Sequence, residues 1–232
     1  MPTNIVDIIC IAVLIISVLY GMYRGFISGI LSLAGLIASI AGAFVLTPNL
    51  SGILKGNETL VNTLLYYTDA ASRIGNVDLS TLSVSQVTSG TLSDILQKAK
   101  LPPAFENLFI RQMQTAVGTA KVSSVLSQSI VNASITILSF LICFLGCYLV
   151  ALFFIHMISY VFEFPVLRHL DSLVGGLFGF VRGYLTLVIL FALVPLVLAV
   201  APVEQIQQMV NSSQLAPLFD TRLIFSILGL GG

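Results

Sequence analysis

The sequence Gly21-Met22-Tyr23-Arg24-Gly25-Phe26 stands where a long uncharged stretch of the chain begins. Its pattern, Gly-x-x-Arg-Gly-aromatic, occurs again in Gly179-Phe180-Val181-Arg182-Gly183-Tyr184. Around each copy glycine recurs at every fourth position, so the glycines share one face of a helix. The chain thus has a lone arginine beside a glycine ridge at two places. The repetition predicts that the fold uses the same structural feature twice. The first ridge is Gly21, Gly25 and Gly29, and the second ridge is Gly175, Gly179 and Gly183.

The composition is typical of a protein that has lipid as its main solvent. Of the 232 residues, 57% are hydrophobic and only 9% are charged, whereas soluble domains average about 25% charged residues. So few charges could not cover a water-exposed surface, and we therefore expect the lipid bilayer as a partner. The formal net charge is +0, and without a basic tail nothing points to nucleic acid.

Four apolar stretches are long enough, or nearly so, to cross the hydrocarbon core, which takes about 20 residues in a helix. Their composition is that of helices and not of alternating barrel strands. We therefore predict an all-α polytopic membrane protein with four transmembrane helices in two hairpins, the first closed by a tight turn at Gly21–Gly25. The four stretches are Ile5–Tyr20, Phe26–Thr47, Ile135–Phe162 and Tyr184–Val203.

This pattern divides the chain into four parts. Residues 1–48 form the first transmembrane hairpin, and residues 49–134 form a polar, partly helical insert outside the membrane. Residues 135–203 form the second hairpin, whose helices are joined by a glycine-rich connecting segment, 163–183. The tail, 204–232, has too few apolar residues to cross a bilayer, so we expect it at the membrane interface.

Two helices are predicted inside the insert. Asn57 can cap a helix over 57–70, whose leucines recur at a spacing of three to four. A second helix begins at Pro102-Pro103 and carries Phe105, Leu108, Phe109, Met113 and Val117 on one face. The predicted loop lies between them, over 75–90.

Arg182 admits two placements. If the fourth helix starts near Leu173, Arg182 lies roughly 13 Å inside it at ~1.5 Å per residue. If the glycine segment is a separate interfacial or re-entrant helix, Arg182 lies at the membrane boundary, as Arg24 does. The repeat favours the second placement. Arg24 and Arg168 fall in the two short loops, so we expect those loops to be cytoplasmic, with both termini and the insert outside.

The paired motifs, in this order, resemble the colicin V production protein family. Two positions depart from the family pattern: Gly29 stands where an acidic residue is common, and Ser172 stands where a basic residue is common. The matching segments are Val6-Asp7-Ile8, Tyr23-Arg24-Gly25-Phe26 and Leu31-Ser32-Leu33, then Leu170-Asp171 with Gly175, Gly179 and Arg182-Gly183, and, more weakly, Ser213-Gln214-Leu215-Ala216-Pro217-Leu218-Phe219.

The resemblance implies an integral protein of the bacterial cytoplasmic (inner) membrane, linked to the production of a secreted peptide toxin and to envelope maintenance. No enzymatic activity is established for that family. The sequence itself shows no nucleophile–base set, no histidines at ligand spacing and no phosphate-binding lysine motif. Cys143 and Cys147 lie four positions apart without nearby acids, which favours a packing stripe. We therefore predict no catalytic, cofactor or metal site.

The two glycine ridges have a direct physical use. Small residues let helix backbones approach closely, so the ridges could pack on each other or across a homodimer interface. The alternative is that they only loosen a bend.

Charged residues at the membrane interface also have several possible roles. Arg24 and Arg182 could bind lipid phosphates by snorkelling, pair with Asp171, or hold a substrate. Asp7 could relay protons or ions, or it could be an acid favoured by the dipole of the first helical turn.

Two functions remain open from the sequence. The first is a non-enzymatic scaffold or accessory factor that assembles through its glycine faces and serves an envelope or secretion partner. The alternative is a small channel or transporter that uses the two hairpins as repeats. The polar residues of the apolar stretches include no pair of opposite charges, which favours the scaffold.

Overall fold

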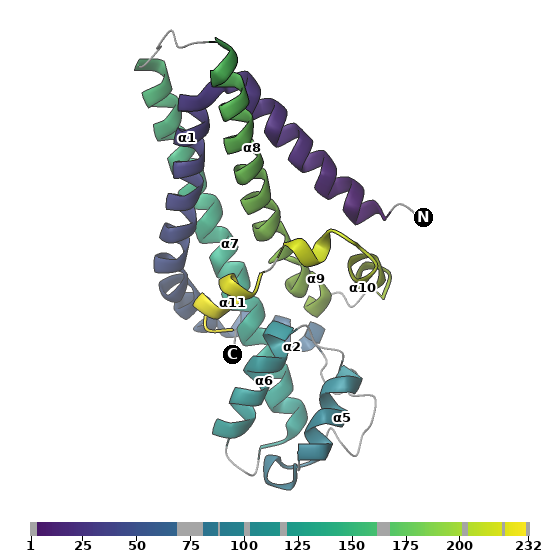
Figure 1. Ribbon diagram of the computed structural model, residues 1–232. Coiled ribbons are helices and arrows are strands. Elements are labelled where there is room, and N and C mark those ends of the chain that lie inside the picture. The colour runs from purple at the N-terminus through teal and green to yellow at the C-terminus, as the bar shows by residue number, and fades with distance from the viewer. Residues whose placement is uncertain are drawn as a thin grey trace. The chain divides into compact units, whose positions relative to one another are not determined.

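The protein is described by a computed structural model (Figure 1). Apart from an isolated antiparallel bridge between Ser83 and Lys121, the described residues form only helices and turns, which confirms the all-α prediction. The structure describes residues 4–68, 81–87, 89–99, 103–116, 120–161, 168–200, 204–219 and 221–230. The elements are α1 (Ile5–Lys55), α2 (Glu58–Thr68), η1 (Val84–Gln86), α5 (Ser89–Ala99), α6 (Pro103–Thr115), α7 (Val122–Val161), α8 (Arg168–Phe191), α9 (Val194–Val200), α10 (Glu204–Asn211), η2 (Ala216–Leu218) and α11 (Arg222–Ile227).

In the described part of the chain, three helical segments are long and apolar enough to cross a membrane: Ile5–Lys55, Val122–Met157 and Ser172–Leu198. The sequence predicts four spans, and the difference lies in α1. This helix of 51 residues contains both apolar stretches of the first predicted hairpin. If straight, it would be about 76 Å long at ~1.5 Å per residue, more than twice the ~30 Å of a hydrocarbon core.

Helix α1 bends sharply at Gly25, where φ is 80° and ψ is −179°. A residue with a side chain rarely adopts this conformation. Figure 1 shows two arms that diverge from the bend; we call residues 5–24 the first arm and residues 26–55 the second arm. The predicted tight turn over Gly21–Gly25 is therefore wrong, because the residues before Gly25 stay helical and one glycine reverses the chain.

The second arm also continues through Pro48, where the sequence predicts its end. A proline inside a helix removes one backbone hydrogen bond. Hydroxyl groups make additional bonds near it: Thr47 donates to the carbonyl of Ala43, and Ser51 donates to the carbonyl of Pro48.

Helix α8 runs without interruption through the second ridge. The predicted connecting segment over 163–183 is therefore wrong for residues 168–183, and so is the separate interfacial helix that favoured a boundary position for Arg182. Each glycine costs a helix about 1 kcal/mol relative to alanine, but the close backbone contacts of these glycines offset that cost. The remaining residues of the segment, 163–167, lie outside the described part of the chain.

The chain forms two compact units. The first comprises Met1–Thr47, Phe140–Val194 and Val203–Thr221. In it α8 contacts both arms of α1, and the later part of α7 packs on the second arm. A Cβ on Gly42 would lie 3.1 Å from the Cys147 sulfur. The rings of Phe44 and Phe140 are 5.0 Å apart.

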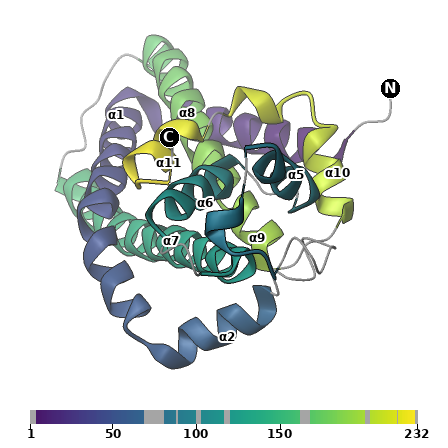
Figure 2. The same cartoon turned by 90° about the horizontal axis from the view of Figure 1, so that it is seen from below.

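The second unit comprises Pro48–Ser139, Pro195–Pro202 and Arg222–Gly232. Its helix α6 begins at Pro103 and buries three of the predicted face residues, Phe105, Phe109 and Met113. Leu108 is only half-buried, and Val117 lies outside the described residues. Figure 2 shows α6 beside the first part of α7, and the Ser129 hydroxyl donates a hydrogen bond of 2.8 Å to Gln112.

The predicted cap of α2 is also confirmed, because the Asn57 side chain accepts the N–H of Leu60. Of the predicted loop over 75–90, residues 75–80 and 88 lie outside the described part, and η1 and the start of α5 occupy about half of the rest.

Candidate functional site

The glycines of the two ridges meet where the first arm of α1 crosses α8, and we call this contact the glycine seam. A Cβ added to Gly21 would lie 2.3 Å from the carbonyl oxygen of Gly175. One added to Gly179 would lie 2.3 Å from the carbonyl oxygen of Ser17. These separations leave no room for a side chain, so the two backbones touch directly.

The seam extends to the remaining ridge positions. A Cβ on Gly29 would lie 3.1 Å from Cβ of Phe178, and one on Gly183 would lie 2.8 Å from Cβ of Ser17. The Ser172 hydroxyl adds a hydrogen bond of 3.1 Å to the carbonyl of Met22. The structure thus brings all six glycines together within one chain.

The arginines of the two motif copies converge on one aromatic ring, that of Tyr20. The Cζ atom of Arg24 lies 5.2 Å from the ring centroid, and the Cζ atom of Arg182 lies 4.9 Å from it. Both distances are within the range of cation–π attraction, which extends to about 6 Å. Tyr20 was not predicted as part of a site, although its position four residues before Arg24 places the two on one helix face.

The direction of the Arg182 side chain follows from helix geometry. Its neighbour Gly183 lies level with Ser17, which is one turn farther from the bend than Tyr20. Side chains on a helix point toward its N-terminus, and the N-terminal end of α8 lies at the bend. Arg182 therefore reaches past Ser17 toward Tyr20 and brings its charge closer to the level of Arg24.

The predicted pairing of the arginines with Asp171 stays a prediction, because the Asp171 side chain lies outside the described residues. Arg24 is exposed and Arg182 is half-buried. The two positive charges lie no more than about 10 Å apart, because both Cζ distances are measured to one ring, and they repel each other. An anion between them would remove that repulsion.

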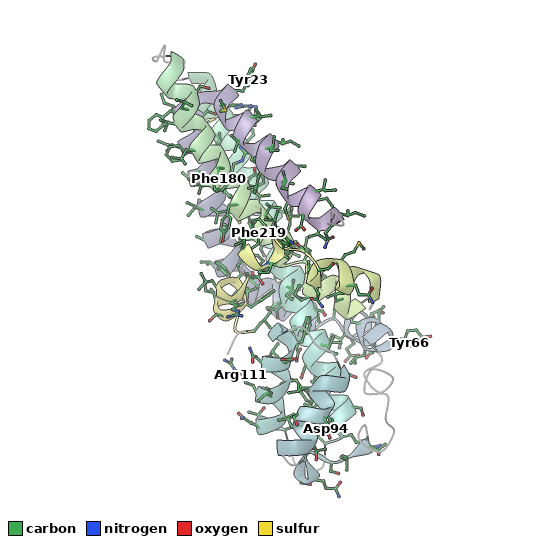
Figure 3. All side chains as sticks on the ribbon, turned by 45° about the vertical axis from the view of Figure 1, so that its right-hand side comes forward. Tyr23, Tyr66, Asp94, Arg111, Phe180 and Phe219 are labelled. Carbon is green, nitrogen blue, oxygen red and sulfur yellow. The ribbon has the colours of Figure 1, made fainter. Side chains whose placement is uncertain are left out.

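An aromatic side chain stands outward beside the bend. Tyr23 is 89% exposed, and Figure 3 shows it at the end of the molecule where the bend lies. Phe180 on α8, farther from the bend, is 45% exposed. Tyrosine is enriched at the boundary between lipid and water.

Asp7 binds a distant part of the chain that the sequence did not connect with it. Its carboxylate accepts the Ser213 hydroxyl at 2.5 Å, the N–H of Leu215 at 3.0 Å and the N–H of Gln214 at 3.3 Å. The Ser213 hydroxyl in turn accepts the N–H of Ala216 at 3.0 Å. We call this set of bonds the Asp7 latch.

Aromatic side chains hold the same part of the tail. The Phe219 ring lies 5.3 Å from that of Phe191 and 5.4 Å from that of Tyr184. The Tyr184 hydroxyl donates to the carbonyl of Leu218 at 3.0 Å. The motif at Ser213–Phe219, the weakest match in the sequence, is therefore the segment that docks on α1 and α8 (Figure 3).

Beside the latch lies an apolar groove of about 170 Å³. Its lining holds no charged side chain, so it offers no path for an ion. Among the residues with described positions, no three His, Cys, Asp or Glu side chains are grouped to hold a metal ion. The groove is lined by Val6, Ile9, Cys10, Leu187, Leu190, Phe191, Val194 and Val210.

The comparisons with known proteins give one match. A family model described as "Colicin V production protein" matches residues 6–106 and 111–223, which is most of the chain. Neither the search of curated proteins nor the search of solved structures gave a match.

Proposed function

Because the chain belongs to the colicin V production protein family, we propose that it is a non-enzymatic integral membrane protein. In this proposal it acts as a scaffold or accessory factor in peptide-toxin production and export and in envelope maintenance. The family match over most of the chain is the observation that carries the proposal. The helices long and apolar enough to cross a membrane support it.

The roles of the described polar groups also support a scaffold. The Asp7 carboxylate accepts hydrogen bonds from the tail. The glycines of the two ridges let the backbones of α1 and α8 touch. Each of these groups has a partner that accounts for it through packing or hydrogen bonding. The groove at the latch is apolar, which suits an aliphatic chain better than a polar solute.

We further propose that the chain crosses the bacterial inner membrane four times. At ~1.5 Å per residue the first arm is about 30 Å long and α8 is about 36 Å long, and each is sufficient for one crossing. The second arm and the later part of α7 supply the other two. The bend at Gly25 and the start of α8 then face the cytoplasm, with the insert and both termini outside.

Assembly through the glycine faces is a separate proposal. The seam joins α1 and α8 of one chain, so the same contact could form between two copies only if they exchanged α8. Analytical ultracentrifugation of the detergent-solubilised protein tests this: a stable dimer that the Gly179→Leu variant abolishes would support exchange, and a monomeric wild type would exclude it.

The function is tested by complementation. A strain that lacks this protein and carries a colicin V production system should secrete less toxin, and the wild-type gene should restore secretion. Gly179→Leu should fail to restore it, whereas Gly146→Ala should succeed because nothing lies within 4 Å of a Cβ at Gly146. Unchanged secretion in the deletion strain would overturn the proposal. Selective ion or solute flux into liposomes that contain the pure protein would instead support a channel.

A further inference from the structure

We propose that Arg24 and Arg182, whose guanidinium groups both lie against the Tyr20 ring, form a single binding site for the phosphate group of an anionic membrane phospholipid. This proposal is independent of any role in toxin production. It rests on the proposed membrane arrangement only in placing the bend of α1 at the lipid surface.

The geometry brings two cations from different helices to one place. Arg24 is the last residue before the bend of α1, and Arg182 lies in the middle of α8. Because both Cζ distances are measured to one ring centroid, their sum limits the separation of the two Cζ atoms to about 10 Å. Rotation of two long side chains can therefore bring both guanidinium groups onto one phosphate.

The chemistry of the three side chains fits such a ligand. A guanidinium group presents paired N–H donors that match two oxygens of a phosphate, and it also stacks on aromatic rings. The Tyr20 ring can hold both guanidinium planes while their outer N–H groups stay available for the ligand. Tyr20 is 40% exposed, so the site is open to a molecule that arrives from the lipid.

The location favours a lipid over a soluble anion. The arms of α1 are apolar up to the bend, and Arg24 lies at the point where they end. Basic pockets between membrane helices on the cytoplasmic side bind anionic headgroups. Arg182 extends toward the same level from a deeper position, as expected of an arginine that snorkels to a charged surface.

A lipid titration of the full-length protein in neutral detergent tests the proposal. Thermal unfolding is followed while short-chain phosphatidylglycerol, short-chain phosphatidylcholine or inorganic phosphate is added. Both lipids carry an anionic phosphodiester, but the choline ammonium group of phosphatidylcholine offsets that charge and is repelled by the two arginines. We therefore expect half-maximal stabilisation at a phosphatidylglycerol concentration about tenfold lower than that of phosphatidylcholine. Inorganic phosphate should give no stabilisation at the same concentrations.

Matched variants test whether the two arginines cause the preferential stabilisation by phosphatidylglycerol. Arg24→Gln and Arg182→Gln should each remove the preference for phosphatidylglycerol, and Arg→Lys variants should keep part of it because the charge remains. Tyr20→Phe should retain the preference, and Tyr20→Leu should weaken it. Lys121→Gln neutralises an exposed cation in the second unit and should have no effect.

Several outcomes would overturn the proposal. One is equal stabilisation by the two lipids. Another is that Arg24→Gln and Arg182→Gln keep the full preference for phosphatidylglycerol over phosphatidylcholine. If these two variants do not fold, the full preference in Tyr20→Leu would overturn the proposal instead. Stabilisation by inorganic phosphate that depends on both arginines would assign the site to a free anion.

Discussion

Asp7 and Ser213 are separated by 206 positions in the sequence, yet the hydroxyl of Ser213 donates a 2.5 Å hydrogen bond to the Asp7 carboxylate. The same carboxylate accepts the N–H of Leu215, and the neighbouring Asn4 side chain donates to the carbonyl of Met209. The first turn of α1 therefore serves as an external cap for the turn that precedes η2, and it ties the two ends of the first unit together.

The latch predicts that Asp7 controls how firmly the tail is docked. Asp7→Ala removes three hydrogen bonds and leaves the hydroxyl of the buried Ser213 without its acceptor, which is unfavourable. We expect the segment 211–219 to be cut by protease several-fold faster in this variant. Limited proteolysis of the detergent-solubilised protein, with mass spectrometry of the fragments, measures the rate.

The exposed acid Asp94 on α5 provides the control for the latch. It belongs to the second unit, so Asp94→Ala should leave cleavage of the tail unchanged. Equal cleavage rates for the wild type and Asp7→Ala would show that the aromatic contacts of Phe219 alone hold the tail in place.

The glycine seam predicts that the stability of the protein falls steeply as the side chains at the seam become larger. Gly21→Ala and Gly179→Ala should each destabilise the protein by about 1–3 kcal/mol, the usual cost of overpacking, because each new methyl group would meet a backbone atom. Gly179→Leu should abolish folding or accumulation. Thermal unfolding in detergent and the yield of membrane-inserted protein provide the measurements.

Gly146 on α7 is the matched control for the seam. It also lies inside an apolar helix, but nothing lies within 4 Å of a Cβ at that position. Gly146→Ala should therefore be neutral or stabilising by up to about 1 kcal/mol, which is the gain in helix propensity. If Gly146→Ala and Gly179→Ala had the same effect, the seam would not be the tight contact described above.

Much of the fold could be predicted from regular spacing. The fourfold glycine spacing identified both ridges, and the periodic aromatic residues after Pro103 identified α6. The length of the apolar stretches indicated membrane helices. Each of these signals is local and repeats along one helix, so a single sequence contains it in full.

The errors came from positions where a tertiary contact decides the backbone. Glycines 175–183 suggested a connecting segment, but their contact with α1 makes a continuous helix favourable. Pro48 suggested a helix end that the structure does not have. The partner of Asp7 could not be found, because no periodicity links two residues at opposite ends of the chain.

The bend of α1 predicts that Gly25 cannot be replaced without strain. At φ 80°, a side chain costs about 1–3 kcal/mol, so Gly25→Ala should relax toward a straighter helix and separate the arms. Spin labels are placed on the exposed positions Ile11 and Ile37, one on each arm. Pulsed electron paramagnetic resonance then measures the distance between the two labels. We expect a longer mean distance in Gly25→Ala than in the wild type. An unchanged distance distribution would mean that contacts with α8 hold the arms without help from Gly25.

The proposed four crossings predict opposite exposure of the bend and the insert. Tyr23 is 89% exposed beside the bend, and Asp94 is exposed on α5 of the insert. A single cysteine is placed at either position after Cys10, Cys143 and Cys147 have been replaced by alanine. In intact spheroplasts a membrane-impermeant maleimide should label Asp94→Cys at once, and Tyr23→Cys only after permeabilisation. The second arm, residues 26–55, lies between the bend and the insert, and at ~1.5 Å per residue it is long enough to span ~30 Å of hydrocarbon. The two sites can therefore share a side only if the second arm fails to cross. Labelling of both cysteines from the outside would therefore exclude the four-span arrangement, and with it a cytoplasmic position for the arginine pair.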